Sequence, residues 1–201
     1  MRLRTDWEII SKRVDIIKRQ IEKMEISPNL VALLVAAEDH RYGKHPGVDL
    51  ISMCRATWKS LFCGKREGGS TIAMQLVRVL TGRFERTIGR KLVEIYLAIR
   101  LTRNVDAHDI PRLYLAIAYY GWQMNGLKQA SKRLNFNPSN LAQREAASII
   151  ARLKYPEPKQ VNEKRCIQIS ERAKHIIDRA DRLFGNQQTV VYRLGKSNGS
   201  I

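Results

Sequence analysis

Apolar residues recur at helical spacing along most of this chain. Through residues 6–25 they follow one another at steps of three and four: Ile10, Val14, Ile17, Ile21 and Met24. This spacing predicts an amphipathic helix. Ser27-Pro28-Asn29 interrupts the pattern and supplies the residues that start a second helix, which is expected to end near Glu38.

The later segments repeat this alternation of helices and breaks. A third apolar-rich segment covers residues 48–63, and Gly68 to Thr71 opens a helix through Val79 with Ser70 or Thr71 as N-cap. Further helices are predicted over residues 86–102, 109–120, 140–153 and 163–184, the last with its apolar residues on one face: Ile169, Ala173, Ile176, Ala180 and Leu183. A short strand is expected over Thr189–Leu194, followed by a frayed tail over 195–201. The pattern predicts a mainly α protein.

The length of 201 residues suits one domain with a sizeable core, so residues 1–201 are interpreted as a single unit. Lys and Arg number 36 against 19 Asp and Glu, a net charge of +17. Such an excess indicates an anionic partner, either nucleic acid, a membrane surface or a phosphorylated substrate. Composition alone does not choose among these.

Cysteine spacing and hydropathy add limits. Cys54, Cys63 and Cys166 fit neither a zinc site nor a disulfide framework, so they are interpreted as ordinary thiols. The longest uninterrupted apolar run is Leu30 to Ala37, well short of the roughly 20 residues that a spanning helix needs. The amino terminus shows no signal-peptide pattern. No export signal or anchor is therefore expected in this chain.

Three segments carry candidate chemistry. The first is an acidic pair, Glu38-Asp39, placed after an apolar run and before a turn with Gly43, Pro46 and Gly47. A carboxylate at such a place can be partly buried yet open to a cleft, where it is able to move protons. The alternative is a solvated helix end.

The second segment runs from Gly68 to Arg78, and the third from Arg86 to Glu94. Glycines before a helix start leave backbone N–H groups that can hold a phosphate, with Ser70, Thr71 and Gln75 as added donors. In a helix, Arg86, Arg90 and Glu94 would share one face, with Lys91 beside Glu94. The alternatives are an ordinary capped helix and a ladder of surface salt bridges.

In this order, the three segments resemble the motifs of the peptidoglycan glycosyltransferases, which are the transglycosylase modules of monofunctional enzymes and of class A penicillin-binding proteins. The family pattern E-D-x-x-F-x-x-H-x-G is matched by Glu38, Asp39, His45 and Gly47, with Tyr42 in place of Phe. G-G-S-T-I-x-x-Q-L-x-K is matched from Gly68, with Arg78 as the final cation. R-K-x-x-E is matched by Arg90, Lys91 and Glu94. The resemblance covers about residues 25–160.

The resemblance implies a lysozyme-like helical fold with a larger lobe and a small membrane-touching lobe. The implied reaction polymerises lipid II by attack of an acceptor hydroxyl on the donor sugar, with inversion and release of polyprenyl pyrophosphate. Glu38 would be the base, with Asp39 in support, and Glu94 a second catalytic residue. The implied substrate-binding residues are Asp39, Ser70, Thr71, Gln75, Arg78, Arg86, Arg90 and Lys91.

The implied partners are lipid II, the growing glycan strand and an anionic membrane surface; contacts with other cell-wall synthesis proteins are also allowed. No organic cofactor is expected. A divalent ion, Mg²⁺ or Mn²⁺, is allowed, although its ligands are unknown. The family implies a peripheral position on the outer, periplasmic face of the cytoplasmic membrane. Residues 48–62 combine Trp58 and other apolar residues with Arg55 and Lys59, which suits a membrane interface or, alternatively, a buried core.

Three departures and three rival functions remain open. Ala116 stands where the family has Asn, Ala73-Met74 replaces a polar pair, and Lys154 lies near a usual Pro. The rivals are a non-catalytic binder of lipid II or glycan, a lytic enzyme and, from charge alone, a nucleic-acid-binding protein. The cations suited to pyrophosphate argue against a lytic enzyme, and no nucleic-acid motif is present.

Overall fold

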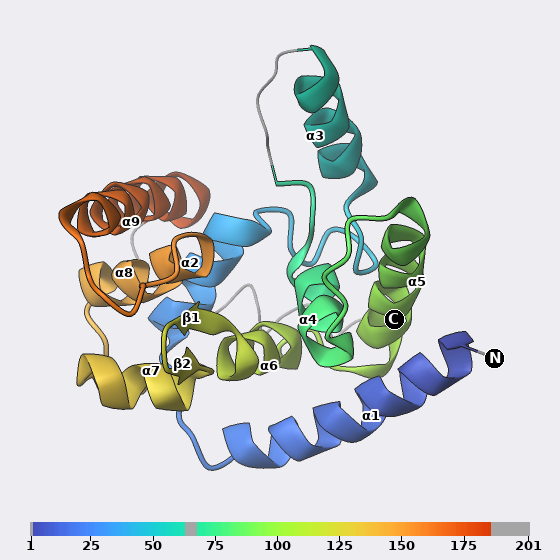
Figure 1. The fold of residues 1–201 in the computed structure, drawn as a ribbon, viewed down its shortest axis with the longest axis horizontal. Coiled ribbons are helices and arrows are strands. Elements are labelled where there is room, and N and C mark those ends of the chain that lie inside the picture. Colours follow the sequence, from blue (N-terminus) through green and yellow to red (C-terminus); the bar gives the residue numbers. More distant parts are fainter. Residues whose placement is uncertain (1, 63–67, 186–201) are drawn as a thin grey trace.

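The structure, a computed structural model, describes residues 2–62 and 68–185. The expected strand at Thr189–Leu194 and the expected tail lie outside these residues, and so does Cys63. Figure 1 shows a body of packed helices from which α3 (Leu50–Phe62) projects. The prediction of a mainly α, two-lobed lysozyme-like fold is confirmed, with one small hairpin as the β structure of the described residues.

The central helix of the body is α2 (Pro28–Glu38). Ser27 caps it, accepting a hydrogen bond from the Asn29 N–H at 3.2 Å, and Pro28 occupies its first turn, as the sequence predicts. Most of its own side chains are apolar. They pack against three other helices: α6 (Asp109–Ile117), α8 (Gln143–Lys154) and α9 (Glu163–Phe184). Its carboxyl end reaches the surface at Glu38, the last residue of the helix.

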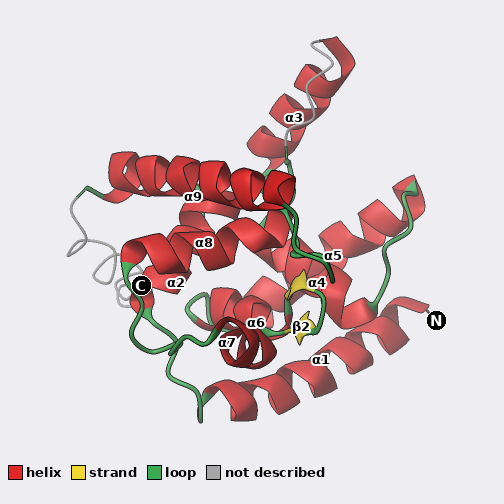
Figure 2. Ribbon diagram, turned by 60° about the vertical axis from the view of Figure 1, so that its left-hand side comes forward, coloured by secondary structure: helices red, strands yellow, loops and turns green. Residues whose placement is uncertain are grey.

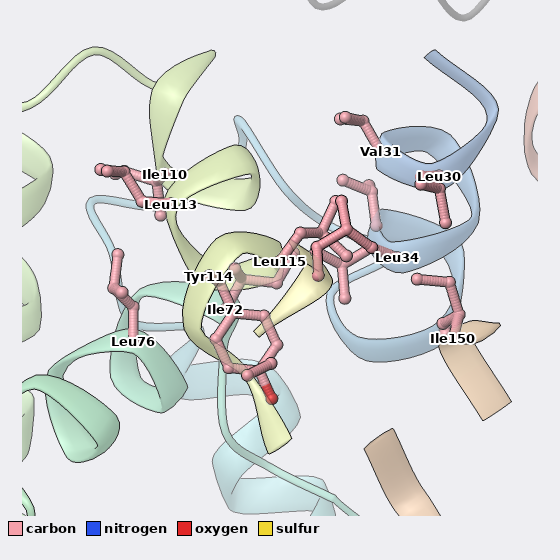
Figure 3. Packing of buried hydrophobic residues seen from close by; sticks show 14 of the residues in the cluster. Leu30, Val31, Leu34, Ile72, Leu76, Ile110, Leu113, Tyr114, Leu115 and Ile150 are labelled. Carbon is pink, nitrogen blue, oxygen red and sulfur yellow. The ribbon is translucent and has the colours of Figure 1, made fainter. Parts of the chain in front are cut away.

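Two helices carry the remaining motifs. α4 (Ile72–Thr81) packs against α5 (Ile88–Asn104) and α6, and α1 (Arg2–Ile21) lies across α4 and α6. Figure 3 shows the core formed where α2, α4, α6 and α8 meet, with Leu34, Ile72, Tyr114 and Ile150 among its labelled side chains. The motif-bearing helices are therefore held by one continuous core.

The predicted helix over 109–120 is too long. α6 ends at Ile117, and β1 (Tyr119–Gly121) and β2 (Met124–Asn125) form an antiparallel hairpin before α7 (Leu127–Leu134), neither of which the pattern indicated. Figure 2 shows this hairpin beside α6 and α7. The cause is tertiary: Gly121 lies so close to Glu157 that a Cβ would stand 2.5 Å from its carbonyl oxygen.

Other boundaries shift by a few residues. The first helix begins at Arg2 and ends at Ile21, before Met24, and the predicted 140–153 helix begins at Gln143. The prediction for 163–184 agrees with α9, and its buried face carries Ile169, Ala173, Ile176 and Ala180 as expected. Among the described residues, no helix is long and apolar enough to span a bilayer.

Candidate active site

Glu38 stands at the mouth of a cleft. Its side chain is 21% exposed, and its Oε2 accepts a hydrogen bond from Gln75 Nε2 of α4 at 3.1 Å. Its Oε1 lies 3.5 Å from Arg172 Nη2 of α9. The carboxylate therefore has one neutral donor, one distant cation and an open side.

Asp39 is occupied by the protein. Its Oδ1 lies 2.8 Å from His45 Nε2, and its Oδ2 accepts a hydrogen bond from the Ile72 N–H at 3.2 Å. The side chain is buried among these partners. Asp39 thus joins the end of α2, the following turn and the first residue of α4, which fits the predicted support of Glu38. Its direct binding of substrate stays a prediction.

The turn after Asp39 depends on Gly47. This residue has a φ of +91°, and a Cβ there would lie 2.7 Å from the carbonyl oxygen of Ala98 on α5. Only a residue without a side chain can approach α5 so closely in this conformation. Gly47 thereby allows its own carbonyl to accept a 2.6 Å hydrogen bond from Thr71 Oγ1.

Thr71 is the N-cap of α4, one of the two residues predicted for that place. Its hydroxyl accepts from the Met74 N–H at 3.2 Å while donating to Gly47, and the side chain is buried. The hydroxyl of Thr71 is therefore used in hydrogen bonds that hold the fold together. The first amides of α4 are also partly taken, by Asp39 and by Thr71 itself, so the free phosphate-binding N–H groups predicted from the glycines are reduced in number.

Glu94 is the centre of a buried ion cluster. Its side chain is 3% exposed and accepts hydrogen bonds from Arg78 Nε and Nη2 at 3.0 Å, from Lys91 Nζ at 2.9 Å and from Arg90. The interpretation as surface salt bridges is wrong, because α4 covers this face of α5. Burial alone raises the pKa of Glu94, but the bonds from Arg78 and Lys91 outweigh burial, and the pKa is lowered.

The cluster holds its cations toward Ser70. Arg78 Nη2 and Lys91 Nζ donate to Ser70 Oγ at 3.3 and 3.0 Å. The hydrogen bonds that Arg78 donates to Glu94 raise the pKa of Arg78, whereas burial lowers the pKa of Lys91. Glu94 thus keeps three positive groups together, one of the roles that the sequence left open for it.

Arg86 is not part of this cluster. The predicted 86–102 helix in fact begins at Ile88 with Thr87 as its N-cap, so Arg86 precedes the helix and cannot share the face of Arg90 and Glu94. Its side chain is exposed and does not line the cleft that contains Glu38. Thr87 accepts the Arg90 N–H, which explains why the helix starts there.

The cleft between these groups is about 610 Å³ in volume and is rich in cations. Its charged lining comes from α2, α3, α4, α8, α9 and the loop residues beside them: Glu38, Asp39, Asp49, Arg55, Lys59, Arg78, Lys154, Arg172 and Arg179. Six of these are basic and three acidic, so the cleft favours an anionic ligand. Gln75 and Ser70 also line it, as the sequence predicts.

Arg172 and Arg179 were not identified from the sequence. They lie seven residues apart on α9, which places them two turns apart on the same face, but no local rule says that this face meets α2. Arg172 also donates to the Ala37 carbonyl, and Arg179 Nη2 lies 3.1 Å from His40 Nδ1. Burial, then the nearby Arg172 and Arg55, lower the pKa of Arg179.

The acidic residues do not offer a ready metal site. Both oxygens of Glu94 accept bonds from cations, and both oxygens of Asp39 are occupied. Within residues 2–62 and 68–185, no group of three or more His, Cys, Asp or Glu side chains is arranged to hold an ion. The described side chains therefore do not fit a protein-held divalent ion at Glu94, and the use of Mg²⁺ or Mn²⁺, which the resemblance allows, stays a proposal.

Two of the three departures lie away from the cleft lining. Ala116 is half-buried against the core, Ala73 and Met74 are buried in it, and none lines the cleft with Glu38. Lys154 does line the cleft and adds a positive charge there. The changes at Ala116 and at Ala73-Met74 therefore leave the charged groups around Glu38 in place.

Comparison with known proteins bears on the family of this chain. A family model described as Transglycosylase matches residues 8–181, a longer stretch than the motifs alone cover. Penicillin-binding protein 1C of Escherichia coli (strain K12) is 35% identical over 127 residues, which is 62% of this chain and 16% of that protein. Penicillin-binding protein 1A of the same organism is 34% identical over 140 residues, 66% of this chain and 16% of that protein.

A relative from a different bacterium gives the same result. Penicillin-binding protein 1F of Bacillus subtilis (strain 168) is 34% identical over 108 residues, 53% of this chain. The chain spans only 15–16% of the length of these relatives. Since the family model covers most of the chain, the chain belongs to the transglycosylase family, the peptidoglycan glycosyltransferases whose module occurs in class A penicillin-binding proteins.

Proposed function

We propose that this chain polymerises lipid II into glycan strands, with inversion at the donor sugar and release of polyprenyl pyrophosphate. The observation that carries this proposal is the shared cleft of Glu38 and Arg78. The partly exposed carboxylate of Glu38, the Gln75 amide bonded to it and Arg78, which Glu94 holds, line the same cleft. That pairing suits a hydroxyl nucleophile on one side and a pyrophosphate leaving group on the other.

In the proposed step, the 4-hydroxyl oxygen of the acceptor N-acetylglucosamine attacks the anomeric carbon of the donor N-acetylmuramic acid. The new C–O bond forms as the bond from that carbon to the pyrophosphate oxygen breaks. Glu38 takes the hydroxyl proton, because a neutral sugar hydroxyl is a poor nucleophile at pH 7. A single displacement on an α-linked donor gives a β-linked product.

The leaving pyrophosphate gains negative charge in this step. Arg78 and Lys91, already turned toward Ser70, are positioned to neutralise that charge without rearrangement. Because Glu94 accepts hydrogen bonds from both cations before substrate arrives, the stabilising charge is pre-organised. Arg172 and Arg179 add positive charge on the α9 side of the same cleft.

The test is polymerisation of labelled lipid II by the purified chain in detergent with Mg²⁺ or Mn²⁺. The expected product is a muramidase-sensitive ladder on a gel, and Glu38→Gln is expected to remove it while the substrate still binds. Binding without a ladder from the parent would overturn the catalytic proposal and support the non-catalytic binder. Cleavage of preformed strands would instead support the lytic enzyme.

We also propose a peripheral position on the outer face of the membrane, with α3 as the contact. Trp58 and Phe62 are 63% and 67% exposed, and their rings lie 4.2 Å apart between centroids. Leu50 and Ile51 are exposed on the same helix, so the buried-core interpretation is wrong for these four residues. Exposed aromatic and aliphatic side chains beside Arg55 and Lys59 suit an anionic interface.

Liposome flotation tests this membrane contact. Trp58→Glu is expected to lower binding to anionic vesicles several-fold, because a charge replaces an inserted ring. Val161→Glu is the matched control, since Val161 is exposed on the main body, beside the groove between α8 and α9, rather than on α3. Equal loss in both variants would point to net charge alone, and equal binding of Trp58→Glu and the parent would count against α3.

A further inference from the structure

Tyr114 lies outside the cleft but is connected to it by a hydrogen-bonded chain. The residue comes from α6, its side chain is buried, and it does not line the cleft. Its hydroxyl donates to Gln75 Oε1 at 2.7 Å, and Gln75 Nε2 in turn donates to Glu38 Oε2 at 3.1 Å. Three helices thus contribute one residue each to a chain that ends at the proposed base.

The side-chain amide of Gln75 determines the direction of the two hydrogen bonds in this series. A glutamine side chain can face a carboxylate with its NH₂ group, which donates, or with its carbonyl, which repels it. Burial raises the pKa of Tyr114, so the phenol keeps its proton and can donate. A phenol that donates must meet the Gln75 carbonyl, and the NH₂ group is then turned toward Glu38.

The hydrogen bond from Gln75 restricts the rotation of the Glu38 carboxylate. The last torsion of a glutamate side chain is broad, so a partly exposed carboxylate rotates freely unless a partner holds it. The other contact, with Arg172, is long at 3.5 Å. With Oε2 held by Gln75, Oε1 keeps the freer lone pairs for accepting the proton in the proposed step.

We infer that Tyr114 is a positioning residue for the base, acting through the orientation of Gln75. Tyr114 itself touches no reacting atom. The inference rests on the proposed function for its effect on rate, but the orientation of Glu38 can be measured without turnover. Figure 3 shows the Tyr114 ring among the apolar side chains of the core, which explains why its place is fixed.

The test uses the full chain and two tyrosine variants. Tyr114→Phe keeps the ring and removes only the donor. Tyr120→Phe is the matched control, because Tyr120 is fully buried and its hydroxyl donates to the Leu115 carbonyl at 2.9 Å rather than to Gln75 or Glu38. Thermal melting of both variants checks that each is folded.

For Tyr114→Phe, kcat is expected to fall by about 10- to 100-fold with KM nearly unchanged, since the base is misplaced rather than lost. Tyr120→Phe should leave kcat unchanged. Gln75→Leu should abolish the effect of adding Tyr114→Phe, since the tyrosine acts through Gln75.

A second readout separates this inference from the proposed function. In protein labelled with carbon-13 at glutamate carboxyls, the Glu38 signal is the one missing from Glu38→Gln. At constant pH, its chemical shift should change in Tyr114→Phe and in Gln75→Leu, and not in Tyr120→Phe. A changed signal without any polymer from the parent would uphold the positioning and overturn the proposed function. An unchanged signal, with polymer still formed, would overturn the positioning alone.

Discussion

The two glutamates of the site occupy opposite environments. Glu38 is at the end of a buried helix, open to the cleft, with a neutral amide as its nearest partner. Glu94 is enclosed in the first turns of α5 and holds Arg78, Arg90 and Lys91. A carboxylate that must accept a proton needs an open side, whereas one that assembles cations needs all its lone pairs occupied. The same type of side chain therefore suits a different role at each of the two positions, and its surroundings determine which role.

The largest expected difference between the two is in stability. Glu94→Gln leaves three cations without their common anion, and we expect a loss of about 2–3 kcal/mol in the free energy of unfolding, or about 5–10 °C in Tm. This is below the usual cost of a broken buried pair because the side chains of Arg78 and Lys91 are each 30% exposed. Thermal melting should show Glu38→Gln unchanged, and equal losses would erase the distinction.

The dependence of stability on pH sharpens the contrast. The folded state lowers the pKa of Glu94 from its ordinary value of 4.5, so its contribution to stability is fully present above that value. As pH falls through the lowered pKa, the contribution disappears. The difference in unfolding free energy between parent and Glu94→Gln should be constant from pH 7 to about 5 and shrink below 4.5. A difference that grew in acid would contradict this assignment.

Two basic residues, Lys91 inside the Glu94 cluster and Arg86 outside it, can be compared by their effects on kcat. Lys91→Ala removes a cation held at Ser70 and should lower kcat by about 10-fold or more. Arg86→Ala removes an exposed cation outside the Glu94 cluster and should change kcat by less than about threefold, since exposed charges interact weakly. Steady-state rates with lipid II measure both. A larger effect at Arg86 would mean that the substrate extends beyond the cleft.

The smallest effect is expected at Thr71. Thr71→Ala removes the N-cap of α4 and the bond to Gly47, at a cost of about 1–2 kcal/mol in unfolding free energy. Thr71→Ser keeps the hydroxyl and should stay near the parent. Urea unfolding measures the difference. If Thr71→Ala instead raised KM with unchanged stability, the residue would be a substrate ligand, as the motif alone suggested.

Local sequence was a good guide where a helix and its cap depend on neighbouring residues. Ser27-Pro28 starts α2, Thr71 starts α4, and the apolar positions of α9 face the core as predicted. It failed at the hairpin of Tyr119–Gly121, because Gly121 pairs with Glu157, a residue 36 positions later. The prediction also failed at Arg86. Because α5 begins at Ile88 rather than at residue 86, Arg86 lies outside the Glu94 cluster.

The sequence by itself determined the helical class, the ordered motifs and the presence of an acidic pair at the end of an apolar helix. Those features follow from spacing, caps and residue chemistry within a few turns of chain. Only the tertiary structure decided that Glu94 is buried, that Arg172 and Arg179 face Glu38, and that Tyr114 reaches it through Gln75. These outcomes depend on which helix faces which, and core packing between distant segments determines them.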